Sequence, residues 1–408
     1  GKIHPFMDKT RENKYNKRSS KVIFGQGGPT VQYRQFGTMK ENVSALGFGC
    51  MRLPTTDGDP NSGAFDETEA IRMIRHGIDN GVNYIDTAYF YHSGQSESLV
   101  GKALKDGYRE KTYLATKSPV FSMKTESDFE RILEEQLVRL QTDTIDFYLL
   151  HALSLNTWNN VVLKFELLDK MERAKAAGKI RHIGFSFHDS YEAFQKIVDG
   201  YGHWDFCQIQ LNYIDIHHQA GIEGLEYAAS KGLGVIVMEP LLGGKLASPT
   251  KAVAAELSPE KSPVEWALDF LWNRPEVSLL LSGMHSFQQV EDNLMYASRS
   301  SVGMLSEKDL SMLSRAKTVY DTMALVSCTK CSYCMPCPFG LDIPGTFEAY
   351  NSTVSLGMEK ASALYEKLPK KAEACRACKH CEKACPQHLP IHELMPVIQK
   401  CFAKERKE

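Results

Sequence analysis

Short apolar runs alternate with amphipathic stretches from about residue 44 to residue 300. Short apolar runs bounded by turn-forming residues are typical of buried strands, whereas apolar residues three and four positions apart indicate one face of a helix. Amphipathic stretches occur at 67–80, 127–140, 165–177 and 222–230, and a glycine follows three of them, as it follows many helices. The apolar runs predict eight strands, at 46–48, 82–85, 113–116, 145–150, 182–185, 206–211, 234–238 and 278–281.

Eight strands that alternate with helices over about 250 residues have the size and order of a (β/α)8 barrel. The alternative is an open, doubly wound sheet, which is weakened because no Gly-x-Gly-x-x-Gly follows the first strand. We therefore predict an α/β chain with four parts. They are a disordered or foreign extension (1–30), a (β/α)8 TIM barrel (31–300), a helical connector (301–327) and a small, mainly α-helical domain (328–408).

Composition narrows the class of partner. The chain has 408 residues, of which 43% are hydrophobic and 24% charged, and its formal net charge is −2. This balance gives no reason to expect nucleic acid or an anionic membrane as partner. No apolar run reaches the roughly 18 residues that a membrane span needs, and residues 1–30 are polar and basic, without the apolar core of a secretory leader. We expect a cytoplasmic protein.

Three successive predicted strands end in polar side chains. Asp86 ends one strand and Tyr91 follows five residues later, while Lys117 and His151 end the next two strands. Barrel enzymes carry their catalytic residues at the carboxyl ends of the strands. Taken alone, each residue has an ordinary structural explanation, such as a capping aspartate or a packing tyrosine. Four of them at consecutive strand ends indicate one shared site.

Residues 86–97 read Asp-Thr-Ala-x-x-Tyr-x-x-Gly-x-Ser-Glu. With the strand-end residues, this segment resembles the aldo-keto reductase family, and the resemblance covers roughly residues 32–297. It implies that Tyr91 is the acid/base that protonates a carbonyl oxygen and that Lys117 makes this proton easier to release. It also implies that Asp86 holds Lys117 and that His151 orients the carbonyl. Tyr89 competes for the acid role, but the spacing of the motif favours Tyr91.

The resemblance further implies a nicotinamide cofactor, NAD(H) or NADP(H), with the preference open. Glycines and a helix N-terminus suit its phosphates, because they offer free backbone N–H groups. Each candidate taken singly could equally be a turn glycine or a core residue. The candidate cofactor-binding residues are Gly49, Cys50, Met51, Asp86, Ser186, Gln208, Met238, Pro240, Leu241, Gly243, Gly283, Gln289 and Asn293.

The sequence departs from the family pattern at three places. Phe187 stands where an asparagine would follow the serine, and Met238 stands where an aromatic ring would stack on nicotinamide. Gly283 and Gln289 stand where a lysine and an arginine would hold the 2′-phosphate of NADPH. These departures predict little preference for NADPH over NADH.

Nine of the eleven cysteines lie beyond residue 327, and eight of them form two runs. The second run has the Cys-x2-Cys-x2-Cys-x3-Cys-Pro spacing of bacterial ferredoxins, and the first run is one residue shorter before its last cysteine. In two-cluster ferredoxins the Cys-Pro cysteine of one run ligates the cluster of the other run. We call this crossed ligation. It predicts two 4Fe–4S clusters, one held by Cys328, Cys331, Cys334 and Cys385, the other by Cys375, Cys378, Cys381 and Cys337.

Zinc or disulfides could also use these cysteines. Two zinc sites of four cysteines would need the same ligands, but zinc ribbons use paired Cys-x2-Cys units rather than runs of four that end in Cys-Pro. A disulfide scaffold is unusual in a large chain without a secretory signal. Cys50, Cys207 and Cys401 fall outside both runs. The long insert between the runs resembles the α-helical ferredoxin domains of respiratory subunits.

These features predict an oxidoreductase of the aldo-keto reductase type, which interconverts a small carbonyl compound and an alcohol and carries two clusters for electron transfer. Hydride transfer moves two electrons together, whereas each cluster passes one. A ferredoxin, a flavodoxin or a flavoprotein is therefore a possible redox partner. The alternatives are an electron-transfer or interaction module with a catalytically idle barrel, and clusters whose role is purely structural.

Overall fold

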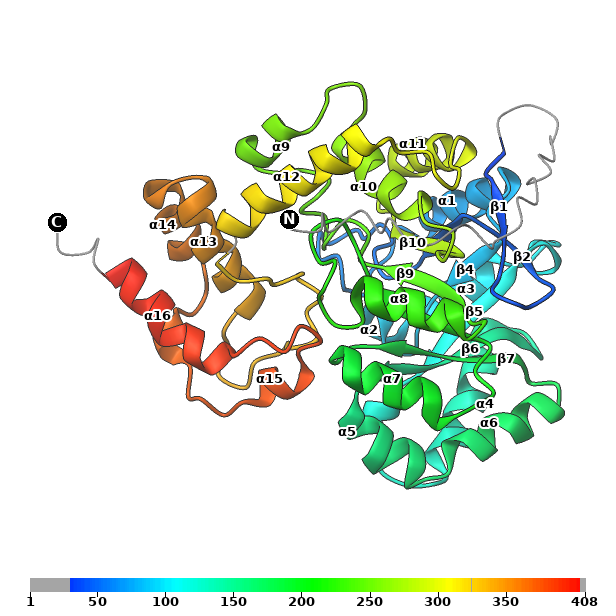
Figure 1. The fold of residues 1–408 in the computed structure, drawn as a ribbon. Helices are drawn as coiled ribbons and strands as arrows, with labels where there is room; N and C mark the ends of the chain where they lie inside the picture. The colour runs from blue at the N-terminus through cyan, green and yellow to red at the C-terminus, as the bar shows by residue number, and fades with distance from the viewer. Residues whose placement is uncertain (1–29, 324, 404–408) are drawn as a thin grey trace. The chain divides into compact units, whose positions relative to one another are not determined.

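The computed structural model describes residues 30–323 and 325–403, so nearly all of the expected extension lies outside the described residues. The chain forms two compact units (Figure 1). The barrel unit comprises the described parts of residues 1–240 and 264–310. The cysteine unit comprises residues 241–263 and the described parts of 311–408.

Eight parallel strands close into a barrel, which confirms the predicted (β/α)8 fold and excludes the open sheet. Neighbouring strands pair in chain order, and the last strand pairs with the first. The strands are β3 (Leu46–Gly49), β4 (Tyr84–Asp86), β5 (Tyr113–Ser118), β6 (Ile145–Leu153), β7 (Ile180–Phe187), β8 (Phe206–Gln210), β9 (Gly234–Met238) and β10 (Leu279–Gly283).

Helices connect these strands, as the amphipathic stretches predict. Most present an apolar face to the barrel, such as Ala70, Met73 and Ile74 in the first of them. The main helices of the barrel unit are α1 (Glu67–Asp79), α2 (Tyr91–Gly94), α3 (Ser96–Ala103), α4 (Asp128–Leu140), α6 (Leu167–Ala176), α7 (Tyr191–Gly200), α8 (Gly221–Ser230), α10 (Pro263–Trp272) and α11 (Phe287–Ser298). A short α5 (Leu155–Thr157) follows β6.

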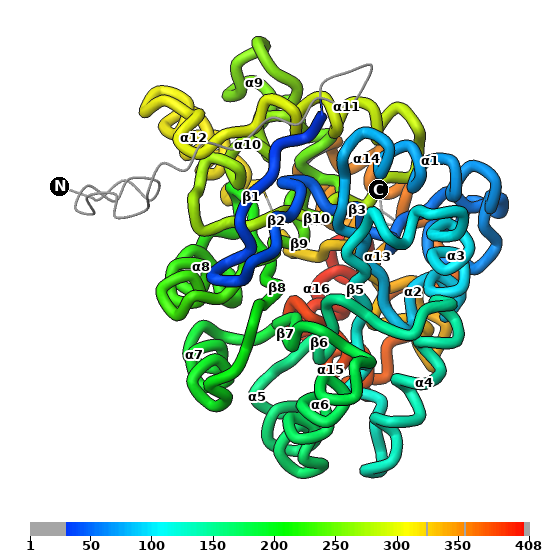
Figure 2. The backbone as a smooth tube through the Cα atoms, turned by 90° about the vertical axis from the view of Figure 1, so that its right-hand side faces the viewer, coloured from blue at the N-terminus to red at the C-terminus, as the bar shows by residue number. Residues whose placement is uncertain are grey.

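An antiparallel hairpin precedes the barrel, formed by β1 (Tyr33–Gln35) and β2 (Asn42–Ser44). Figure 2 shows it across one end of the barrel. Phe36 in its turn is fully buried, and its ring centre lies 4.9 Å from that of Phe147 and 5.6 Å from that of Phe206. The hairpin therefore closes the end of the barrel at which the strands begin, and it leaves the carboxyl ends of the strands available for a site.

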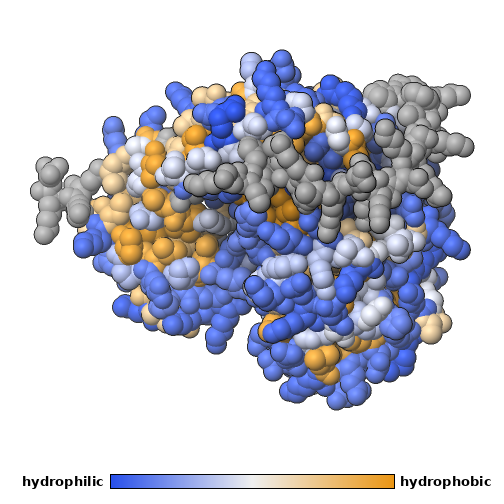
Figure 3. Space-filling model, in the orientation of Figure 1, coloured by the Kyte–Doolittle hydropathy of each residue, from blue (hydrophilic) through white to orange (hydrophobic). Residues whose placement is uncertain are grey.

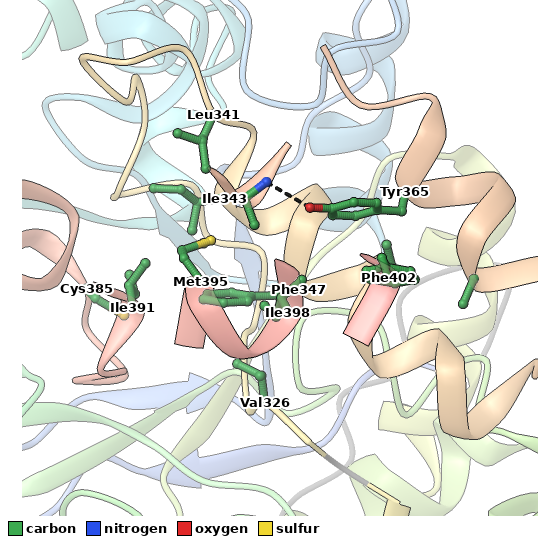
Figure 4. Packing of buried hydrophobic residues seen from close by; sticks show 13 residues of the cluster. Val326, Leu341, Ile343, Phe347, Tyr365, Cys385, Ile391, Met395, Ile398 and Phe402 are labelled. Atoms are coloured by element: carbon green, nitrogen blue, oxygen red, sulfur yellow. Dashed lines mark hydrogen bonds between the residues drawn. The ribbon is translucent and has the colours of Figure 1, made fainter. Parts of the chain in front are cut away.

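The cysteine unit is helical and has its own apolar core. Its helices are α9 (Lys251–Glu256), most of α12 (Glu307–Met323), α13 (Ile343–Ser355), α14 (Met358–Glu366), α15 (His380–Ala384) and α16 (Ile391–Ala403). Figure 4 shows the core, in which the rings of Tyr365 and Phe402 stack with centres 4.1 Å apart. The Tyr365 hydroxyl accepts a hydrogen bond from the Ala372 N–H at 2.8 Å. This core fixes the segments that carry the cysteines.

Figure 3 shows apolar surface in the region where Figure 1 places α13 and α14. The exposed large apolar side chains of these helices and their connection are Val354, Leu356 and Leu364. Among the described residues, no helix is both long enough and apolar enough to cross a bilayer.

Candidate active site and cysteine cavities

Lys117 and Asp86 form an ion pair at the carboxyl ends of β5 and β4. The Lys117 Nζ lies 2.6 Å from Asp86 Oδ1, and both side chains are buried, with 0% and 3% exposure. The same Nζ donates to the Thr87 carbonyl at 2.9 Å. Burial raises the pKa of Asp86, and the Lys117 charge opposes that rise. The second carboxylate oxygen of Asp86 accepts no hydrogen bond from the described residues.

Tyr91, and not Tyr89, faces this ion pair. Its hydroxyl lies 3.3 Å from the Lys117 Nζ, and the ammonium lies 4.8 Å from the centre of its ring. The Tyr89 hydroxyl instead donates to Glu135, and its ring lies 4.1 Å from the Arg139 guanidinium. The structure therefore gives the two tyrosines different surroundings, and the one at the motif position shares the ion pair.

His151 is directed by a bulge near the end of β6. The register between β6 and β7 shifts between Leu150 and Leu153, and Ala152 has a φ of 55°, which is uncommon for a residue with a Cβ. The Ala152 N–H donates to Ser186 Oγ at 2.7 Å. Bulges redirect side chains next to active sites. Here the bulge lies beside His151, whose ring meets that of Tyr91 edge to face, 6.0 Å between centres.

The environment of His151 favours its neutral form. Burial lowers its pKa well below the usual range, and the positive charges of Lys117 and His188 lower it further. A neutral imidazole keeps one ring nitrogen as a donor and one as an acceptor. Asp86, Tyr91, Lys117 and His151 thus meet at one place, as the strand-end pattern predicts.

A buried polar network supports the strand that carries Lys117. Glu97 is fully buried and accepts hydrogen bonds from Thr116 Oγ1 at 2.6 Å and from Gln136 Nε2 at 2.7 Å. Gln136 Nε2 also donates to the Lys117 carbonyl at 3.0 Å, and Arg139 lies 3.3 Å from the carboxylate of Glu97. A buried carboxylate with this many donors fixes the backbone around it.

Gly49 and Cys50 lie beside Asp86. The Cys50 N–H donates to the Asp86 carbonyl at 2.8 Å, and burial raises the pKa of the Cys50 thiol. A Cβ on Gly49 would lie 3.2 Å from the Ser282 carbonyl oxygen, so the backbone of β10 approaches closely here. Met51 follows and is partly buried.

The ends of β7, β8 and β9 place Ser186, Gln208 and Met238 in adjacent strands. Ser186 pairs with Gln208 in register, and Gln208 Nε2 lies 3.4 Å from the Met238 sulfur. The Gln208 Oε1 is buried and accepts no hydrogen bond from the described residues. Phe187 is fully buried and packs on Phe194, 5.0 Å between ring centres.

The candidate phosphate residues around α11 are partly used by the protein itself. Gln289 Oε1 accepts from the His285 N–H at 2.9 Å, and Asn293 Nδ2 donates to Ser282 Oγ at 3.0 Å. A Cβ on Gly283 would lie 3.2 Å from the Arg52 side chain. Of the remaining candidates, Pro240 belongs to the barrel unit, whereas Leu241 and Gly243 belong to the cysteine unit.

Eight cysteines line two cavities of the cysteine unit. Cavity 1 is lined by Cys328, Cys331, Cys334 and Cys385. Cavity 2 is lined by Cys337, Cys375, Cys378 and Cys381. Each set is the one that crossed ligation assigns to a single cluster. In the described part of the chain, no three His, Cys, Asp or Glu side chains converge as a single metal ion requires.

The two Cys-x2-Cys-x2-Cys loops have the same backbone conformation. The residue before the second cysteine and the residue after it both have a positive φ: Lys330 (57°) and Ser332 (64°) in one loop, Ala377 (51°) and Lys379 (59°) in the other. Where successive residues alternate between right- and left-handed conformations, their N–H groups point into one concavity, which binds anions, as at many iron–sulfur sites.

The Cys-Pro turns also match. The Gly340 N–H donates to the Cys337 carbonyl at 2.9 Å, and the His388 N–H donates to the Cys385 carbonyl at 3.1 Å. Both donor residues have a positive φ, 80° and 51°. Burial raises the pKa of Cys385. The unit is therefore an internal repeat of two cysteine runs, each followed by a turn and a helix.

The segment Leu241–Pro263, which follows β9, folds within the cysteine unit. A Cβ on Gly243 would lie 2.2 Å from the Thr329 carbonyl oxygen, so only glycine allows this approach. Arg315 and Glu256 pair at 3.2 Å. Burial raises the pKa of Cys328, and the charge of Lys245 opposes that rise. The loop that leaves a barrel strand thus packs against the first cysteine run.

Comparison with known proteins identifies both parts of the chain. A model described as the aldo/keto reductase family matches residues 45–315. The chain belongs to the aldo/keto reductase family. A second model, described as a 4Fe–4S dicluster domain, matches residues 327–389. The chain is therefore an aldo/keto reductase family barrel followed by a 4Fe–4S dicluster domain, and the family makes it an oxidoreductase.

Individual relatives match between 38% and 70% of this chain. L-galactose dehydrogenase of Arabidopsis thaliana is 28% identical over 301 residues, which are 68% of this chain and 92% of the relative. The aldo-keto reductase YhdN of Bacillus subtilis is 36% identical over 166 residues, 38% of this chain and 47% of the relative. The solved structure of aldo-keto reductase AKR11C1 from Bacillus halodurans, in its holo form, has a TM-score of 0.58 and 26% identity, and covers 70% of this chain and 96% of that one.

Two sets of residues in this aldo/keto reductase were not predicted from the sequence. The Glu97 network joins residues far apart in the chain, and no local pattern marks Gln136 as a partner of Glu97. The repeat in the cysteine unit did leave a signal. Cys-Pro-x-x-Leu is followed by an isoleucine in both halves, at residues 337–343 and 385–391.

Proposed function

We propose that this aldo/keto reductase interconverts a small carbonyl compound and an alcohol with a nicotinamide cofactor, and that it carries two 4Fe–4S clusters. The observation that carries the catalytic half is the position of the Tyr91 hydroxyl, 3.3 Å from a buried ammonium. That ammonium is paired in turn with Asp86 at 2.6 Å. A tyrosine, a cation and a carboxylate in this order form a proton donor together with the group that stabilises its anion.

In this proposal the chain supplies the proton and the orientation. A carbonyl oxygen that gains negative charge accepts the proton of the Tyr91 hydroxyl, and the Lys117 ammonium stabilises the phenolate that remains. Asp86 keeps Lys117 in place. His151, which is held neutral by burial and by nearby positive charge, donates a hydrogen bond that orients the carbonyl. In the reverse direction Tyr91 takes the proton of the alcohol.

The bound nicotinamide would supply or accept the hydride. The chain offers a partner for its amide group, because the buried Gln208 Oε1 accepts no hydrogen bond from the described residues and Ser186 lies in register beside Gln208. The residues at the 2′-phosphate position fit less well. Gly283 has no charge, and Gln289 holds the His285 N–H. We therefore propose that NADH and NADPH bind with similar affinity.

The cysteine unit fits two clusters. Cavity 1 would take one cluster on Cys328, Cys331, Cys334 and Cys385, and cavity 2 would take the other on Cys337, Cys375, Cys378 and Cys381. The observation that supports clusters over zinc is the pair of matched loops with alternating φ. Such loops direct several N–H groups at an anion larger than a single ion. Two clusters together exchange two electrons, which equals the number that hydride transfer moves.

Anaerobic purification followed by metal analysis and activity assays tests this proposal. We expect a brown protein with about eight irons and as many sulfides per chain, and absorbance changes at the nicotinamide band with at least one member of a panel of aldehydes, ketones and alcohols. About two zinc ions per chain without colour would overturn the cluster assignment. A protein that has its irons but is inactive over the whole panel with both cofactors would support the alternative of an idle barrel.

A further inference from the structure

The two cysteine cavities differ in the exposure of the residues that line them. None of the residues that line cavity 1 is exposed, and three of them, Thr329, Phe347 and Gln387, are exposed by only 1%, 1% and 6%. Cavity 2 is open. Cys378 and its neighbours Ala377 and Lys379 are exposed, and the ring of Phe339, which lines the cavity, is 42% exposed. A carrier can therefore approach the group in cavity 2 more closely than the group in cavity 1.

Positive charge gathers around cavity 2. Residues 367–383 contain five lysines and one arginine but only two glutamates, in a chain whose formal net charge is −2. Arg376 and Lys379 line the cavity, and the Lys370 side chain lies 3.6 Å from where a Cβ on Gly340 would stand, in the Cys337 turn. Within the described part of the chain, Lys370, Arg376, Lys379 and Lys383 form no ion pair, and all four are exposed.

The two cavities adjoin each other. Ile391 lines both of them, and only two residues separate Cys334 of cavity 1 from Cys337 of cavity 2. An electron that enters at cavity 2 therefore has a short path to cavity 1. There the segment that follows β9 approaches Thr329 and brings the charge of Lys245 to Cys328.

We propose that the surface around cavity 2, formed by Phe339, Lys370, Arg376, Lys379 and Lys383, is the docking site of a small acidic protein that carries one electron. The proposal rests on the clusters assigned under the proposed function. In the transfer, the reduced carrier loses one electron and the oxidised cluster in cavity 2 gains it. No covalent bond forms or breaks, and no proton is transferred. An exposed aromatic side chain near exposed cations suits a brief, charge-steered contact, because opposite charge raises association rates about 10- to 1,000-fold and salt screens the effect.

The test uses the anaerobically purified full chain and an acidic bacterial ferredoxin, reduced beforehand and freed of excess reductant. Stopped-flow absorbance follows the bleaching of the chain's clusters at increasing salt. The double variant Lys370→Glu/Lys383→Glu reverses the charge of a lysine near the Cys337 turn and of a lysine two residues after Cys381, and neither residue lines the cavity. Its control, Lys360→Glu/Lys400→Glu, makes the same change of net charge at two exposed lysines elsewhere in the unit. A second variant, Arg376→Glu/Lys379→Glu, reverses the charges at the cavity itself.

We expect the second-order rate constant to fall at least tenfold in each cavity variant at low salt and to stay within twofold of wild type in the control. We also expect salt to slow the wild type more than the cavity variants. Variants that contain about eight irons per chain but react as fast as the control would overturn the docking site and leave the clusters in place. A wild-type chain without iron would overturn the cluster assignment, and the docking proposal with it. Reduction at the same rate by a basic carrier would show that charge does not select the partner.

Discussion

Replacement of Lys117 by methionine should destabilise the barrel by about 3–5 kcal/mol, because it leaves the Asp86 carboxylate buried without its partner. The pair is 2.6 Å long, and its side chains are 0% and 3% exposed, so solvent replaces little of the lost attraction. For a unit of this size, each kcal/mol shifts Tm by about 2–4 °C. We therefore expect Tm to fall by roughly 6–20 °C at neutral pH. The loss should be smaller in acid, since burial raises the pKa of Asp86 and a neutral carboxyl is easier to bury.

Tryptophan fluorescence reports the unfolding of the barrel unit separately from that of the cysteine unit. The chain has four tryptophans, Trp158, Trp204, Trp266 and Trp272, and all of them are buried in the barrel unit. The matched variants are Asp86→Asn and the double variant Asp86→Asn/Lys117→Met. The double variant should lose less stability than the sum of the two single variants, because neither charge then remains unpaired. Additive losses would refute the buried ion pair.

If crossed ligation holds, electron paramagnetic resonance should show that Cys385→Ser and Cys331→Ser damage the same cluster and that Cys378→Ser damages the other. Damage to one and the same cluster by Cys385→Ser and Cys378→Ser would contradict crossed ligation. With Gly283 and Gln289 at the 2′-phosphate position, calorimetry should give dissociation constants for NADPH and NADH within about tenfold, whereas a hundredfold advantage for NADPH, about 2.7 kcal/mol, would contradict the expectation. The pKa of His151 is depressed in the folded protein, so as pH falls the unfolded state binds a proton at this residue before the folded state does. The free energy of unfolding of wild type, relative to that of a His151→Gln variant, should therefore decline as pH falls below about 6.5. A difference that does not depend on pH would argue against a buried, neutral imidazole.

The barrel was predictable because its signals are local. Eight apolar runs and the helices between them have periods that follow from backbone geometry, so the strands were found with small errors at their ends. β8 ends at Gln210 rather than at residue 211, and β6 continues past His151 to Leu153. The continuation of β6 was not predicted, because the bulge there depends on a positive φ at Ala152 and an alanine in the sequence does not indicate a positive φ.

The residues of the candidate site could be predicted from the sequence, but the buried polar network that holds them in place could not. Asp86, Lys117 and His151 lie at or near the carboxyl ends of neighbouring strands, and Tyr91 begins the short helix that follows the first of them, so the topology brings them together. The buried Glu97 and its donors come from α3, β5 and α4, and their meeting depends on how helices pack around the barrel. The assignment of the loop after β9 to the cysteine unit is likewise a tertiary outcome. Nothing in the sequence around Gly243 indicates that it lies against Thr329 in the folded protein.

We have proposed that the barrel reduces carbonyl compounds with Tyr91 as the proton donor. The most direct test compares Tyr91→Phe with Tyr89→Phe on the best substrate of the panel, with iron content and cofactor binding measured on the same samples. Both changes remove one hydroxyl, but only that of Tyr91 lies near Lys117, while that of Tyr89 donates to Glu135. A general acid contributes about 10²–10⁴-fold, so kcat should fall by that factor in Tyr91→Phe, with both cofactor affinity and iron unchanged, and should stay within a few-fold of wild type in Tyr89→Phe. Equal activity of Tyr91→Phe and wild type would contradict the account.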